Sequence, residues 1–168
     1  ALPYYNQSQA LNYFDRSNHL AVSFDATSKG NASVFAVHLQ NELGDKLLLR
    51  GFPSVDQPAS AHAHDVYSAF EKTSEYGQDV GRIENREAWL SHQFRKIGIL
   101  STDSANSAIA TRKEFAGIVR KHLNEPEKNI LMLDCSMHQI ANMEKQMRGV
   151  YDDQTKRVDN LLMMSFGS

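Results

Sequence analysis

Two aspartates in this 168-residue chain each follow an apolar run typical of a buried strand. Asp25 comes directly after LAVSF, and Asp103 follows IGILST. Ligand sites of α/β proteins are built at the carboxyl ends of such strands. Two carboxylates brought together repel unless a cation neutralises them, and their hard oxygen atoms suit Mg²⁺ or Mn²⁺. Such an ion can activate a water molecule or a 3′-hydroxyl for phosphoryl transfer. Taken singly, an Asp at a strand end is often only a turn former or a helix N-cap, with no role in metal binding.

Alternating strand and helix patterns must position these two aspartates. Apolar runs rich in β-formers predict five strands, over residues 19–28, 32–42, 46–55, 96–104 and 129–135. Helical spacing predicts helices over residues 61–77, 105–124 and 136–150. Residues 78–96, which contain the only Trp, fit either a further helix or an irregular connection.

This order predicts an α/β fold with a mixed five-stranded sheet, in which a three-strand meander precedes parallel strands flanked by helices. The order is shared by the ribonuclease-H-like fold, where the first and fourth strands lie side by side and parallel. Asp25 and Asp103 are then expected within about 4 to 8 Å of each other. We divide the chain into a lead-in segment over 1–18, this domain over 19–150, and a C-terminal helical extension or the start of a missing region over 151–168.

Three blocks of sequence carry a family resemblance. LAVSFDATSKGNASVFAVHLQNELGDKLLLRGF resembles the opening of the catalytic domain of hAT-superfamily transposases, where an Asp ends the first strand and a hairpin leads to Gly-Phe. IGILSTDSANSAIATRKEF resembles their strand-Thr-Asp-x-Ala-x-Asn segment, and LMLDCSMHQIANMEKQM resembles their Cys-x-x-His block. The blocks occur in the family's order and together span residues 20–147.

The resemblance implies that Asp25 and Asp103 are catalytic acids and metal ligands, the first two of an Asp-Asp-Glu set that cuts and joins DNA with Mg²⁺ or Mn²⁺. It also implies a nuclear location, DNA bound mainly through flanking regions, and a possible homo-oligomer. The family's third acid lies far downstream, and no acid here, including Glu144, Asp152, Asp153 and Asp159, sits in a matching motif. We therefore interpret the chain, which begins without Met, as a fragment that binds the ion weakly and does not cleave DNA alone.

Cys135 and His138 are three residues apart, so on a helix they can face the same way, as a clamp for a metal or substrate requires. Two ligands are too few for structural zinc. The alternative is a buried, small Cys135 and a hydrogen-bonding His138 near the sheet edge. The resemblance implies that His138 contacts DNA or orients the site.

Several other polar residues have simpler interpretations. His62 and His64 fit the exposed start of a helix better than a ligand pair. Arg112, Lys113, Arg120 and Lys121 can contact a phosphate backbone or form a solvated helix face.

Composition argues against three classes: nucleic-acid binders, disulfide-bonded proteins and membrane proteins. A net charge of −2 does not indicate a nucleic-acid binder, so DNA contacts need a local patch or flanking segments. The single Cys excludes an internal disulfide and favours a reducing, intracellular compartment. No apolar run reaches the roughly 18 residues of a membrane helix, and the first residues do not form a signal peptide.

Two other functions remain open. A domesticated or truncated relative can keep the fold as a regulatory or protein-interaction module without cleavage, which the missing third acid and the acidic charge favour. An exonuclease or ribonuclease H needs another acid in the first strand or first helix. FDATS lacks the Asp-x-Glu pattern of the exonucleases, and Glu71 is the obvious substitute.

Overall fold

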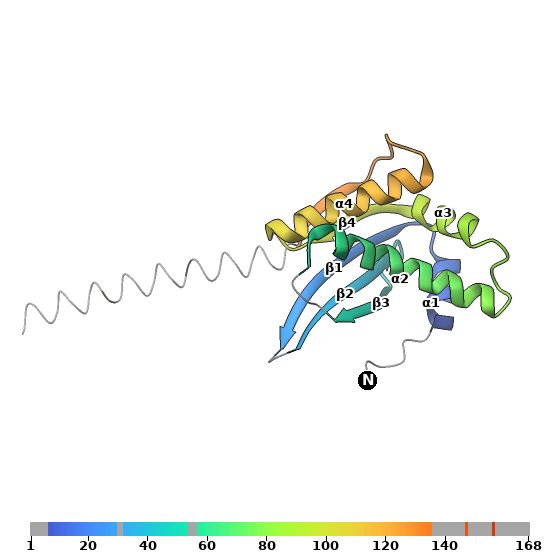
Figure 1. The fold of residues 1–168 in the computed structure, drawn as a ribbon, viewed down its shortest axis with the longest axis horizontal. Coiled ribbons are helices and arrows are strands. Elements are labelled where there is room, and N and C mark those ends of the chain that lie inside the picture. The colour runs from blue at the N-terminus through green and yellow to red at the C-terminus, as the bar shows by residue number, and fades with distance from the viewer. Residues whose placement is uncertain (1–6, 30–31, 54–56, 136–146, 148–155, 157–168) are drawn as a thin grey trace, which may run out of the picture. The chain divides into compact units, whose positions relative to one another are not determined.

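The computed structural model describes residues 7–29, 32–53, 57–135, 147 and 156, and the chain divides into two compact units, 1–133 and 134–168. The described elements are α1 (Gln7–Arg16), β1 (Leu20–Lys29), β2 (Ala32–Asn41), β3 (Lys46–Pro53), α2 (Ala59–Asp79), α3 (Arg86–Lys96), β4 (Ile97–Thr102), α4 (Asn106–Leu123) and β5 (Leu131–Asp134). Figure 1 shows their arrangement.

The five strands form one sheet in the order β3-β2-β1-β4-β5. β1 pairs antiparallel with β2, β2 pairs antiparallel with β3, and β1 pairs parallel with β4. The predicted α/β class and mixed five-stranded sheet flanked by helices are therefore confirmed. So is the predicted neighbouring position of the strands that lead to Asp25 and Asp103.

The stretch that the sequence left open, residues 78–96, contains a helix. Asn85 is the N-cap of α3, and its side-chain oxygen accepts a hydrogen bond from the backbone N–H of Ala88 at 2.9 Å. The lead-in segment, residues 1–18, contains the helix α1. The helix predicted over 136–150 lies outside the described residues, apart from Met147.

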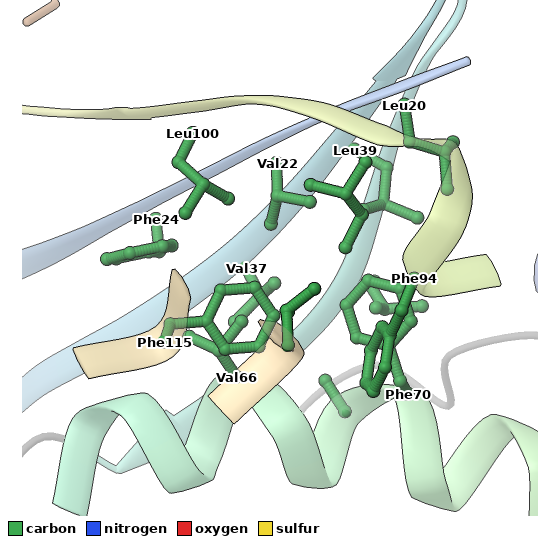
Figure 2. Close-up of a cluster of buried hydrophobic side chains, with 14 of the residues drawn as sticks. Leu20, Val22, Phe24, Val37, Leu39, Val66, Phe70, Phe94, Leu100 and Phe115 are labelled. Atoms are coloured by element: carbon green, nitrogen blue, oxygen red, sulfur yellow. The ribbon is translucent and has the colours of Figure 1, made fainter. Parts of the chain in front are cut away.

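The hydrophobic core lies between one face of the sheet and the helices α2, α3 and α4. Alternate residues of β1, Leu20, Val22 and Phe24, are at most 2% exposed. Figure 2 shows their side chains facing Val66 and Phe70 of α2 and Phe115 of α4. Rings of the core meet edge to face, as in the pair Phe24 and Phe115, whose centroids are 6.4 Å apart.

The carboxylate of Glu42 ties the turn after β2 to the junction between α1 and β1. It accepts hydrogen bonds from the backbone N–H groups of Asn18 and His19, each at 3.0 Å, and from the Asn18 side-chain amide at 3.1 Å. The backbone hydrogen bonds from His19 and Asn18 lower the pKa of Glu42 to about 2.

We expect the free energy of unfolding to depend less on pH in Glu42→Gln than in the wild type. Because the pKa of Glu42 is about 2 in the folded chain and 4.5 ordinarily, the ionised carboxylate stabilises the fold fully above pH 4.5 and loses this effect as the pH falls toward 2. Urea unfolding from pH 7 to pH 2 should show a wild-type advantage over the variant that narrows across this range. Glu127→Gln, which changes an exposed carboxylate, is the control. An advantage of equal size at pH 7 and pH 2 would contradict the assignment.

Because Gly77 has no Cβ, the side chains of Ile83 and Leu11 can pack directly against this position of α2. A Cβ at this position would lie 2.8 Å from Cγ1 of Ile83, nearer still to its Cδ1, and 3.1 Å from Cδ2 of Leu11. We expect Gly77→Ala to destabilise the protein by about 1–3 kcal/mol despite the higher helix propensity of Ala. Gly117→Ala, on the exposed side of α4 with nothing within 4 Å of its Cβ, should instead stabilise by roughly 0.5–1 kcal/mol. Thermal unfolding of both variants tests the contrast, and two changes of the same sign would refute it.

Candidate active site

The two predicted acids come shortly after the paired residues of the neighbouring strands β1 and β4. Val22 pairs with Leu100 and Ser23 with Ser101 in parallel orientation. The pairing ends there, two residues before Asp25 and Asp103, so the placement of Asp25 beside Asp103 stays a prediction. The carboxylate separation of about 4 to 8 Å stays a prediction.

Asp25 lies on the face of the sheet opposite the phenylalanine core. Phe24 is 2% exposed, whereas its neighbours Ser23 and Asp25 are half-buried on the other side of the pleat. Across the hairpin Asp25 pairs with Ala36, which has no polar side chain to bind a carboxylate. Asp25 therefore has its oxygen atoms available for a ligand as far as its strand partner is concerned.

Asp103 comes directly after β4 and makes the turn into α4. Its Oδ1 accepts a hydrogen bond from the backbone N–H of Ala105 at 3.1 Å. Ala105, the N-cap of α4, has no side-chain capping bond of its own, so Asp103 orders the turn before the helix. One carboxylate oxygen thus has a structural role, while a carboxylate offers four lone-pair positions in all.

His38 is a polar neighbour of Asp25 that the sequence analysis did not single out. It pairs with Ser23 on β1, two positions along from the pair of Asp25 with Ala36. Desolvation lowers the pKa of His38, and the nearby Asp25 carboxylate acts in the opposite direction. The available sequence signal was the dipeptide Gly30-Asn31, which is typical of a two-residue hairpin loop. The pairing of Lys29 with Ala32 has that register, which puts position 38 on the same face as position 25.

Asp65, near the start of α2, is an acid that the sequence analysis also did not single out. Burial raises the pKa of Asp65, and His62 acts in the opposite direction from 3.7 Å away. The His62 ring stacks on Phe35 with centroids 4.6 Å apart, and its side chain is only 14% exposed. The expectation of an exposed helix start is therefore wrong for His62, because this aromatic contact draws the ring inward, whereas His64 is exposed as expected.

Arg112 also departs from expectation. It is 6% exposed and donates a hydrogen bond to the backbone carbonyl of Leu133, so it belongs neither to a solvated helix face nor to a phosphate-binding surface. This hydrogen bond connects α4 to Leu133 of β5. Lys113 and Lys121 are exposed, and Arg120 donates to the Lys128 carbonyl at 3.1 Å.

The remaining candidate residues fall into three groups. Cys135 is half-buried and belongs to the second unit. Glu71 is half-buried on α2. The positions that lie outside the described residues are His138, Glu144, Asp152, Asp153 and Asp159.

Metal ligation at this site would depend on the two aspartates. Within residues 7–29, 32–53 and 57–135, no three or more His, Cys, Asp or Glu side chains form a group that could hold a metal ion. Mg²⁺ is commonly held by only one or two carboxylates, with water and substrate phosphates completing its coordination. Asp25 and Asp103 fit that donor set.

Comparisons with protein-family models, curated proteins and solved structures find no match for this chain. In the part of the chain that the structure describes, no helix is long and apolar enough to cross a membrane.

The turn made by Asp103 predicts a difference between two substitutions. Asp103→Asn keeps an Oδ1 acceptor for Ala105, so its free energy of unfolding should stay within about 0.5 kcal/mol of the wild type. Asp103→Ala removes the acceptor and should cost roughly 0.5–2 kcal/mol. Urea unfolding at neutral pH measures both. Equal losses for the two variants would show that the hydrogen bond does not order the turn.

Proposed function

We propose that this chain carries the ribonuclease-H-like core of a hAT-type DNA transposase. In this proposal Asp25 and Asp103 bind Mg²⁺ or Mn²⁺ for metal-dependent DNA strand cleavage and transfer. The observation that carries the proposal is the parallel pairing of β1 with β4, whose register leads to these two aspartates. The strand order β3-β2-β1-β4-β5 supports the ribonuclease-H-like assignment.

The two aspartates would divide the work according to their surroundings. Asp25 sits within β1, where its pairing with Ala36 of β2 restricts its movement. Asp103 sits in the turn after β4, and its hydrogen bond to Ala105 fixes the direction of its carboxylate. When bound, a divalent ion would lower the pKa of a nucleophilic water or hydroxyl and offset charge on the phosphate.

His38 would act near the acids rather than as a ligand. Its lowered pKa favours the neutral imidazole, which can donate one hydrogen bond and accept another. A neutral side chain beside Asp25 leaves the carboxylate charge free to attract a cation. The full reaction also needs a third acid and DNA-binding regions, because a net charge of −2 gives little attraction to DNA.

A second candidate is a module that keeps this fold without cleavage, acting in DNA-associated regulation or protein interaction. The hydrogen bond from Ala105 to Asp103 favours it, because the turn alone is sufficient reason for an aspartate at that position. The two candidates differ in one measurable property, the binding of a divalent cation by Asp25 and Asp103 together.

Manganese binding tests the proposal. We expect the chain to bind Mn²⁺ weakly, and Asp25→Asn and Asp103→Asn each to weaken binding by about tenfold or more, since each removes one of two charged ligands. Water-proton relaxation with Mn²⁺ measures this binding. Asp79→Asn, which neutralises an exposed carboxylate at the end of α2, is the control. Identical binding by all four proteins would refute the site and favour the module without cleavage.

A plasmid-nicking assay with Mn²⁺ at low salt extends the test. We expect no nicking by this chain alone, because two acids hold the ion too loosely for the in-line geometry of phosphoryl transfer. Nicking by the wild type but not by Asp103→Asn would show that a further acid within the chain completes the site. Glu144→Gln and Asp153→Asn would then test which acid it is.

A further inference from the structure

A cavity of about 270 Å³ lies between α1 and the start of β3. It is separate from the aspartate site, since it adjoins the turn after β2, where Leu20 of β1 pairs with Asn41. Asp25 pairs with Ala36, farther along the same two strands. The lining residues are Gln9, Asn12, Tyr13, Arg16, Lys46 and Leu47.

The lining combines positive charge, amide groups and apolar surface. Four lining residues come from a single face of α1, at positions 9, 12, 13 and 16, which recur at helical spacing. Arg16 and Lys46 supply two positive charges, and the half-buried side chain of Leu47 supplies apolar surface. No acidic residue is among those that line it.

Arg16 is held in place by a polar network at one side of the cavity. One of its terminal nitrogens lies 3.3 Å from Oδ2 of Asp45, and its guanidinium carbon lies 5.6 Å from the centroid of the Tyr13 ring. The Tyr13 hydroxyl donates to the backbone carbonyl of Asp45 at 2.9 Å, and the Asp45 N–H donates to Asn41 Oδ1 at 2.9 Å. A guanidinium has five N–H donors, so the contact with Asp45 leaves others for a ligand.

We propose that this cavity binds a small organic carboxylate, a role independent of the proposed function. Arg16 and Lys46 are the two charged residues that line the cavity, which suits an anion, and the nearby carboxylates of Asp45 and Glu42 favour one with a single negative charge. The planar fork of an arginine suits a planar carboxylate, and the amides of Asn12 and Gln9 offer further polar contacts. The volume is just below the roughly 300–1,000 Å³ usual for ligand pockets, so a ligand about the size of benzoate fits, with its ring against Leu47.

Titration of the ¹⁵N-labelled chain with sodium benzoate, followed by NMR, tests the inference. We expect saturable chemical-shift changes confined to α1 and the first residues of β3. Arg16→Gln and Lys46→Gln should each raise the dissociation constant, about tenfold for Arg16→Gln, because a charge-assisted hydrogen bond is lost. Arg82→Gln is the matched control, since Arg82 pairs with Asp15 of α1 at 2.6 Å but does not line the cavity.

Other outcomes would overturn the proposal. Arg16 is 58% exposed, so its variant is expected to fold, and a thermal melt checks this. Benzoate binding that is non-saturable, or equally strong in Arg16→Gln and the wild type, would refute the site. Tighter binding of phenyl phosphate or inorganic phosphate than of benzoate would refute the carboxylate class. Arg16→Lys separates charge from shape, and undiminished binding in this variant would refute the role of the planar fork.

Discussion

The packing of phenylalanine rings between the sheet and three helices is the interaction on which the rest of the described structure depends. Phe24 of β1, Phe70 of α2, Phe94 of α3 and Phe115 of α4 are at most 2% exposed. Phe94 contacts both Phe70, at 5.3 Å between centroids, and Phe115, at 6.3 Å. Full burial of one such side chain contributes roughly 1.5–3 kcal/mol, so this cluster is a major part of the hydrophobic stabilisation. Figure 2 shows Phe24, Phe70, Phe94 and Phe115 gathered against the strands.

This one-sided burial determines which residues of β1 can serve a function. Because successive side chains of a strand point to opposite faces, anchoring Phe24 in the core turns Asp25 to the other face. A register slip of one residue would bury Asp25 and expose Phe24, at a large cost in both desolvation and lost apolar burial. The core therefore secures the orientation of the acid without contacting it.

Asp103 and Glu42 show how carboxylates serve the backbone in this fold. Each accepts hydrogen bonds from backbone N–H groups at a junction between elements, the turn into α4 for Asp103 and the entry to β1 for Glu42. The difference lies in their neighbours. Glu42 lies near the start of β1, where Leu20 pairs with Asn41, whereas Asp103 directly follows β4, the parallel neighbour of β1. A structural role and a ligand role are thus compatible at Asp103, because the turn uses only one of its oxygen atoms.

The sequence by itself determined the succession of strands and helices, because hydrophobic periodicity and turn residues are local properties. It also placed Asp103 directly after β4, whereas Asp25 lies within β1 rather than at its end. It also predicted the pairing of β1 with β4, through the order of the elements. It did not determine α3, because the apolar pattern over residues 86–96 is weak. The helix becomes evident only from the burial of Leu90 and Phe94 in the core. Only the tertiary structure decided that His62 stacks on Phe35, that Arg112 is buried against the Leu133 carbonyl, and that His38 lies near Asp25. These contacts join residues distant in sequence, and their partners depend on strand register and helix packing, which no local pattern specifies.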